Sequence, residues 1–142
     1  MAVRAVVDTS VLVSGLLVVE GPPRQVLDAW LDDRFTLVTS PYQLEELTHV
    51  LACPRVAERI RLAPAELAAI LSGLMMLAVV TPGELQRPGA TRDPKDDAIV
   101  ACAEEGEAAY IVSGDHDLPS LGETRGFQAV TPRQFLEVIA RP

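Results

Sequence analysis

The chain has 142 residues, of which 49% are hydrophobic and 23% are charged, so it has the size of one domain and enough apolar side chains for a core. Its net charge of −8 argues against binding nucleic acid by bulk electrostatic attraction, which usually needs a basic face. The longest apolar run, residues 74–80, is too short to span a bilayer, and the first residues lead into a strand-like run rather than a signal peptide. We therefore expect a single domain over residues 1–142 that is cytoplasmic and has no membrane partner.

Strand-like and helix-like segments alternate along the chain. Short apolar runs predict strands at residues 4–7, 35–39, 78–80, 109–113 and 127–130. Apolar spacing and early prolines predict helices at residues 11–18, after the turn at 21–23 to about residue 32, from 41 onward, and at 64–77, 94–105 and 132–140. Residues 81–92 are rich in Pro and Gly and are expected to form a mobile loop, in which Arg87 and Arg92 fit either a phosphate clamp or a solvated surface. The alternation predicts an α/β fold, a three-layer α/β/α sandwich with a mostly parallel central sheet.

Four carboxylates stand where such a fold gathers the ends of its strands. Asp8 ends the first strand-like run, Asp115 follows the run that ends near Ser113, Asp96 opens a helix, and Glu46 lies inside one. Ligand sites in parallel sheets form beyond the carboxyl ends of the strands, so we expect these four side chains to share an acidic pocket. Grouped carboxylates are costly without a cation, and oxygen ligands without a Cys/His cluster favour Mg²⁺ or Mn²⁺ over zinc.

Helical spacing distinguishes between neighbouring acids on two of the helices. On the helix from residue 41, Glu46 borders the apolar stripe and Glu45 falls nearly opposite it. On the helix at 94–105, Asp96 lies one turn ahead of the apolar face, whereas Asp97 points away. We therefore expect Glu46 and Asp96 to reach the pocket, where a metal ion or a helix amino terminus would compensate a buried charge.

Each acid also has a purely structural interpretation. Asp96 can cap a helix, Asp8 can begin a turn after its strand, and Glu46 can be a solvated charge. Asp115 can be a turn residue in the segment 113–117. No single residue therefore predicts a site, and the hypothesis depends on all four positions meeting at one edge of one sheet.

Four segments together resemble the motifs of the PIN-domain ribonucleases, in order and spacing, over nearly the whole chain. They are residues 6–12 (Val-Val-Asp-Thr-Ser-Val-Leu), 40–51, 93–103 (opening Asp-Pro-Lys-Asp-Asp) and 110–118 (with Ser-Gly-Asp at 113–115). In the family the first motif has Ser, Thr or Asn two residues after its Asp, a position that Ser10 holds here. The sequence is most similar to the VapC-like toxins of toxin–antitoxin systems.

The resemblance implies a PIN-like fold and a Mg²⁺- or Mn²⁺-dependent endoribonuclease acting on RNA, often a homodimer that a small antitoxin protein holds inactive. It implies a catalytic and metal-binding quartet of Asp8, Glu46, Asp96 and Asp115. The supporting or secondary candidates that it implies are Ser10, Ser113, Asp93, Asp97 and Asp117. Ser10 is equally well explained as a cap of the helix that follows it.

Five further residues have ordinary structural interpretations. Trp30, Met75 and Met76 are expected in the core, with an interface as the second interpretation. Cys53 and Cys102 make no metal-binding pattern and lie among apolar residues. Their context predicts two buried thiols in a reduced, intracellular protein.

Other functions compete with a nuclease. An aspartyl phosphotransferase or phosphatase also places an Asp after the first strand, but the haloacid dehalogenase pattern expects a second Asp where this chain has Ser10. A receiver-type signalling domain expects paired acids at the first strand, and a nucleotide-binding module expects a glycine-rich loop after it; this chain has neither there. The non-enzymatic alternative is a catalytically idle PIN-like domain that acts by binding a partner.

Overall fold

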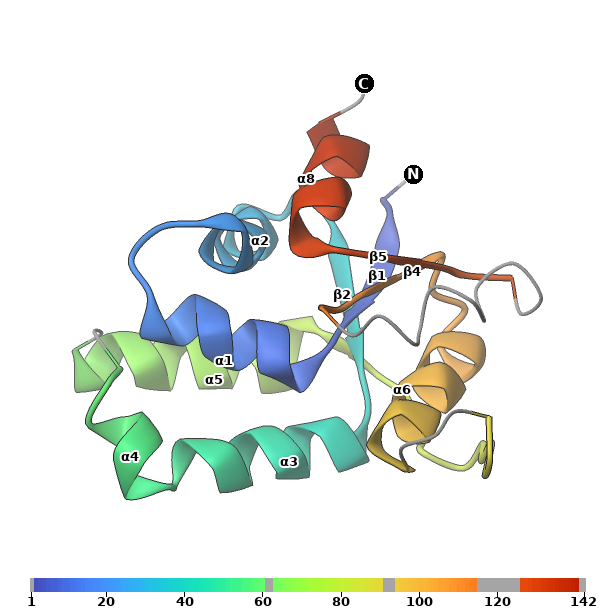
Figure 1. The fold of residues 1–142 in the computed structure, drawn as a ribbon, viewed down its shortest axis with the longest axis horizontal. Coiled ribbons are helices and arrows are strands. Elements are labelled where there is room, and N and C mark those ends of the chain that lie inside the picture. Colours follow the sequence, from blue (N-terminus) through green and yellow to red (C-terminus); the bar gives the residue numbers. More distant parts are fainter. Residues whose placement is uncertain (1, 61–62, 91–93, 115–125, 141–142) are drawn as a thin grey trace.

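A parallel sheet forms the centre of the molecule (Figure 1), as seen in a computed structural model that describes residues 2–60, 63–90, 94–114 and 126–140. Within these residues the sheet has five strands in the order β3-β2-β1-β4-β5, and every neighbouring pair is parallel. The strands are β1 Arg4–Val7, β2 Thr36–Thr39, β3 Val79–Val80, β4 Tyr110–Val112 and β5 Gln128–Val130. The predicted α/β fold is confirmed, although all strands except β1 are one or two residues shorter than the apolar runs that predicted them.

Helices connect and cover the strands. In the described residues they are α1 Thr9–Leu17, α2 Pro22–Leu31, α3 Pro41–Leu51, α4 Pro54–Ala57, α5 Pro64–Leu77, α6 Pro94–Glu105 and α8 Pro132–Ala140. Each of them except α1 begins with a proline, because a first-turn residue needs no N–H donor and proline already has the helical φ. The sequence did not predict α4, whose single turn is too short to show an apolar period. Among these helices none combines the length and apolar character that crossing a membrane would require.

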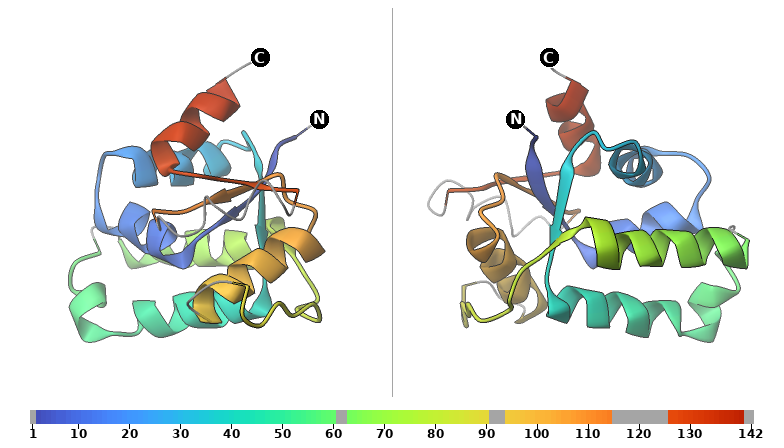
Figure 2. Two further views of the ribbon diagram at one scale, coloured as in Figure 1. Left: turned by 45° about the vertical axis from the view of Figure 1, so that its right-hand side comes forward. Right: turned by 180° about the vertical axis from the view of Figure 1, so that it is seen from behind.

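The two faces of the sheet bury separate apolar cores, because alternate strand residues point to opposite sides. On β1, Ala5 and Val7 face a core shared with α1, α2, α5 and α8, whereas Val6 faces a core shared with α6. α6 accordingly contacts β1, β2 and β4. Figure 2 shows helices on both sides of the sheet, which is the three-layer arrangement that the sequence predicted.

The larger core is built around aromatic side chains. Phe35 and Phe135 are fully buried, and their rings meet edge to face with centroids 4.9 Å apart. Trp30 is buried, as predicted, and its indole ring packs so closely on Gly73 of α5 that a Cβ there would lie 3.3 Å from it. These contacts hold α2, α5 and α8 to one face of the sheet.

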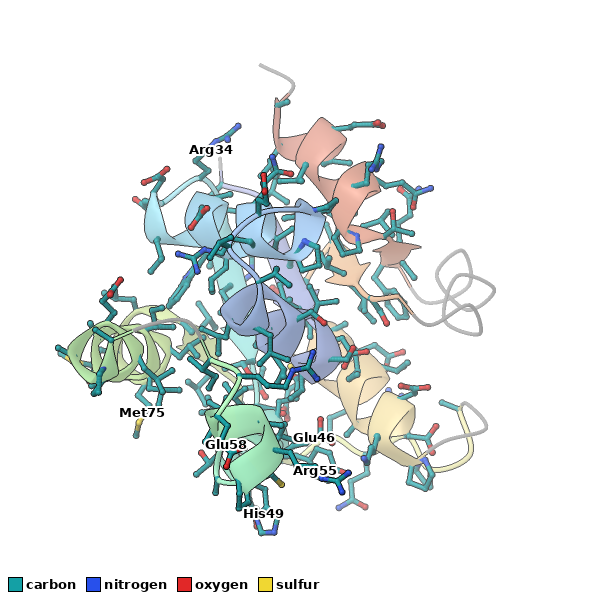
Figure 3. The ribbon with its side chains drawn as sticks, turned by 60° about the vertical axis from the view of Figure 1, so that its left-hand side comes forward. Arg34, Glu46, His49, Arg55, Glu58 and Met75 are labelled. Carbon is teal, nitrogen blue, oxygen red and sulfur yellow. The ribbon has the colours of Figure 1, made fainter. Side chains whose placement is uncertain are left out.

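Two predictions about apolar residues are wrong. Met75 and Met76, predicted in the core, are 72% and 81% exposed, and Figure 3 shows Met75 projecting from α5. α5 buries Leu74 toward the core, and the next two positions turn away from that face by 100° each. Cys53, predicted to be buried, is exposed between α3 and α4, whereas Cys102 is buried as predicted.

Candidate functional site

Asp8 lies at the carboxyl end of β1 and is oriented through both of its carboxylate oxygens. Val7 pairs with Val112 of β4, so Asp8 and Ser113 follow their strands in register. Ser113 Oγ donates a hydrogen bond to Asp8 Oδ2 at 2.9 Å, and the backbone N–H of Ser10 donates to Oδ1 at 3.3 Å. Asp8 is therefore the N-cap of α1, and the interpretation of Ser10 as the cap is wrong because its N–H is the group that is capped.

α3 carries Glu46 toward this strand end. The helix begins after Ser40, whose Oγ accepts a hydrogen bond from the backbone N–H of Gln43 at 3.3 Å. The buried Gln43 side chain in turn donates from Nε2 to the carbonyl of Val7 at 3.4 Å, which ties α3 to the end of β1. Glu46 is half-buried and Glu45 is exposed, as helical spacing predicted. Figure 3 shows Glu46 and His49 leaving α3 in different directions.

α6 places its two adjacent acids in different surroundings. Asp96 is only 7% exposed and faces the same region as Asp8. Asp97 is half-buried, and its Oδ2 accepts a hydrogen bond from the backbone N–H of Gly89 at 3.0 Å. The helix therefore separates the pair as its spacing predicted, and Asp97 serves to hold a loop.

A hollow of about 400 Å³, which we call the acidic hollow, brings these elements together. Its lining consists of Asp8, Thr9, Ser10, Val13, Glu46, Val50, Lys95 and Asp96. Three of the four predicted acids thus meet from β1, α3 and α6 in one concave surface. The fourth, Asp115, lies outside the described residues, as do the secondary candidates Asp93 and Asp117.

The acidic hollow suits a hard divalent cation by its donor chemistry. The described side chains that line it include three carboxylates and neither Cys nor His, a set that favours Mg²⁺ or Mn²⁺ over zinc. Over residues 2–60, 63–90, 94–114 and 126–140, no three His, Cys, Asp or Glu side chains lie close enough together to hold one metal ion. The three described acids therefore share a surface without closing a coordination site among themselves.

Comparison with known proteins gives the family. The sequence profile of the PIN domain matches residues 4–117, which is most of the chain. The chain belongs to the PIN domain family. PIN domains are typically nucleases, and those nucleases usually use divalent metal ions.

Two similar proteins align with nearly the whole length of this PIN domain. MJ1680, an uncharacterized protein of Methanocaldococcus jannaschii, is 24% identical over 143 residues, covering 95% of this chain and 90% of that protein. The crystal structure of PAE2754 from Pyrobaculum aerophilum superposes with a TM-score of 0.61 at 20% identity, covering 99% of this chain and 98% of the other. At 20% identity this structural similarity shows a shared fold and nothing about function.

Sequence reasoning missed two residues near this site, Gln43, which ties α3 to the end of β1, and Lys95. Gln43 was a missed signal, because it lies one turn before Leu47 on the apolar stripe of α3, where a polar residue needs a partner. Lys95 stands between Pro94 and Asp96 and lines the hollow. A single lysine beside acids carries no distinctive pattern, so only the fold reveals its place.

Proposed function

We propose that this PIN domain is a metal-dependent endoribonuclease that hydrolyses phosphodiester bonds in RNA. The observation that carries the proposal is the meeting of Asp8, Glu46 and Asp96 in one hollow at the carboxyl ends of a parallel sheet. These acids come from three elements that are far apart in sequence, which is how active sites in such sheets are built. The usual nuclease activity of the family supports the same reaction class.

In this proposal Asp8, Glu46, Asp96 and Asp115 hold Mg²⁺ or Mn²⁺. The bound cation would lower the pKa of a water molecule and offset negative charge at the phosphate. Asp8 is prepared for this role, since hydrogen bonds from Ser113 and from the Ser10 backbone fix its carboxylate before any ligand arrives. Without a cation the acids would repel an RNA phosphate, so activity should require the metal.

The test is cleavage of a mixed RNA substrate with Mg²⁺, with Mn²⁺ and with EDTA, for the wild type and Asp8→Asn. Asparagine caps helices as well as aspartate does, so the variant should keep α1 and the fold. We expect cleavage by the wild type with either metal, and loss of cleavage in EDTA and in the variant. Cleavage that persists in EDTA or in Asp8→Asn would contradict the proposal. Metal binding without cleavage would favour an idle PIN-like domain.

We further propose that the nuclease is the toxin of a toxin–antitoxin pair and forms a homodimer. The order of its motifs, which is similar to that of the VapC-like toxins, supports this. Induced expression of the wild type should arrest growth of a bacterial host, whereas Asp8→Asn should not. Co-expression of a protein encoded beside it should restore growth and form a complex, and sedimentation should show a dimer. Normal growth under expression of an active nuclease would contradict the toxin role.

A further inference from the structure

Three hollows lie in a row along α3, beginning with the acidic hollow. A middle hollow of about 380 Å³ shares Glu46, Val50 and Lys95 with the acidic hollow. A third hollow of about 540 Å³ shares Tyr42 with the middle one. The candidate metal-binding acids are therefore connected, through shared lining residues, to the largest of the three hollows.

Tyr42 is the exposed aromatic residue of this chain. Of the six Phe, Tyr and Trp residues, it is 46% exposed, Tyr110 is half-buried and the others are buried. It lies in the first turn of α3, where it lines both the middle and the third hollow. An aromatic ring that does not pack in the core, beside a hollow, is available to stack on a ligand.

The third hollow, which we call the proline hollow, has rigid apolar walls. Four prolines line it, at positions 41, 82, 88 and 94, together with Ala98 and Ala101 of α6. Its inner end is formed by Ser40 and Thr81, the residues that directly follow β2 and β3. It therefore lies at the same carboxyl edge of the sheet as the acidic hollow, where ligands of such folds bind.

One wall of the proline hollow is a loop, residues 81–90, that α6 holds in place; we call it the strap. Glu105 accepts hydrogen bonds from the backbone N–H groups of Gly83, Glu84 and Leu85, at 2.8, 3.1 and 2.9 Å. Asp97 accepts from the N–H of Gly89 at the other end of the strap. The hollow is thus formed before any ligand binds, which lowers the entropic cost of binding.

Arg87 of the strap is engaged in the same way. Its Nε lies 2.6 Å from Oε2 of Glu104, whose side chain is 16% exposed. The sequence predicted that Arg87 is either a phosphate clamp or a solvated charge. In the structure Arg87 forms an ion pair with Glu104 of α6. Lys95 lines both the acidic and the middle hollow, so its position links the two.

We propose that the proline hollow is a nucleobase subsite, in which Tyr42 stacks on a base of single-stranded RNA whose backbone passes Lys95 to reach the acidic hollow. The inference rests on the proposed function, and it names the form of the substrate. Base stacking on an aromatic ring contributes strongly to single-strand binding and tolerates any sequence. A chain with a net charge of −8 also needs an attraction to RNA other than bulk electrostatics, and stacking supplies one.

The test is the affinity of the full chain for short fluorescent oligoadenylate and oligouridylate, measured by anisotropy in Ca²⁺, with cleavage followed separately in Mg²⁺. We expect Tyr42→Ala to weaken binding of at least one oligonucleotide by about 5- to 100-fold, the loss of one stacked base, and Tyr42→Phe to retain it. Ala98→Phe, which fills the hollow from α6, should weaken binding in the same way. An oligomer of abasic sites keeps the phosphates, and the wild type and Tyr42→Ala should bind it equally.

Leu31→Ala is the matched control, because it removes a side chain of similar exposure, 49%, from the far end of α2. Its affinity should equal that of the wild type. Unchanged binding by Tyr42→Ala, or no binding of either oligonucleotide by the wild type, would overturn the subsite. Binding that depends on Tyr42, without any cleavage, would support the nucleobase subsite and contradict the proposed nuclease activity. Cleavage by the wild type, with the same RNA affinity in Tyr42→Ala, would support the nuclease activity and contradict the subsite.

Discussion

α6 supplies carboxylates to two neighbouring regions, the acidic hollow and the strap, and the two use them in opposite ways. In the strap, Glu105 receives three backbone N–H donors and Glu104 receives Arg87. In the acidic hollow, Asp96 lies with Asp8 and Glu46, so acids line one surface together. Carboxylates that meet donors stabilise a loop, whereas carboxylates that share one surface repel one another, and the proposed cation would offset that repulsion. Their neighbours, more than their residue type, decide which role they take.

Glu46 gives the sharpest contrast between the regions, because no hydrogen bond or ion pair engages its carboxylate within the described part of the chain. We expect Glu46→Gln to lower metal-dependent RNA cleavage by about 10²- to 10³-fold, since a lost ligand removes several kcal/mol of transition-state stabilisation. The measurement is kcat/KM for a short RNA at saturating Mn²⁺.

Glu45→Gln is its matched control on the same helix. Glu45 is exposed and lines the middle hollow but not the acidic hollow, so this variant should keep the wild-type kcat, with any change confined to KM for the RNA. The reverse result, in which Glu45→Gln loses activity and Glu46→Gln retains it, would show that α3 presents a different face to the substrate.

Ser113 should have a smaller effect, because it acts through Asp8. Its Oγ donates to Asp8 Oδ2, and residues that orient a metal ligand typically change metal affinity by about 10- to 100-fold. We expect Ser113→Ala to weaken Mn²⁺ binding by that factor, measured by calorimetry, while Ser113→Thr retains binding. Equal Mn²⁺ affinities for the wild type and Ser113→Ala would mean that the Asp8 rotamer does not depend on this hydrogen bond.

Much of the fold could be predicted because the local signals agree with one another. The prolines that begin α5, α6 and α8 coincide with the onset of apolar periodicity, and the bounds of these helices match the prediction. The exposure of Met75 and Met76 could not be predicted, because an apolar helix is hydrophobic on every face. Only packing against the sheet decides which of its side chains are buried.

The site was predictable in part for a related reason. Strand ends and helical spacing bring Asp8, Glu46 and Asp96 to one edge of the sheet, and both signals are local. The strap was not predictable, because a Pro- and Gly-rich segment shows no sign of the acids that will hold it. Its partners, such as Glu105 for Gly83, lie 22 residues away on another element.

Gly106 tests the packing beneath the strap. A Cβ at this position would lie 2.5 Å from Val38 Cγ1 and 3.0 Å from Thr81 Cγ2. We expect Gly106→Ala to lower the free energy of unfolding by about 1–3 kcal/mol through overpacking, measured by urea denaturation. At Gly114 an added Cβ meets no atom of the described residues within 4 Å, so Gly114→Ala should leave stability nearly unchanged. Equal stability of the two variants would show that the sheet yields at Gly106.

The smallest effect we expect is a local response of the strap to acid. Partial desolvation would raise the pKa of Glu105, but hydrogen bonds from the backbone N–H groups of Leu85, Gly83 and Glu84 outweigh it and lower that pKa below its ordinary value of 4.5. Because the folded pKa is depressed, the stabilisation is complete above pH 4.5 and is lost as the pH falls through the folded value. The amide signals of residues 83–85 should therefore shift in NMR spectra only below that pH, as the carboxylate is protonated.

In Glu105→Gln this titration should disappear while the Mn²⁺ affinity expected of the acidic hollow is unchanged, which would separate the region that holds a loop from the proposed cation site. A weakened Mn²⁺ affinity in Glu105→Gln would instead show that the two regions of α6 are coupled.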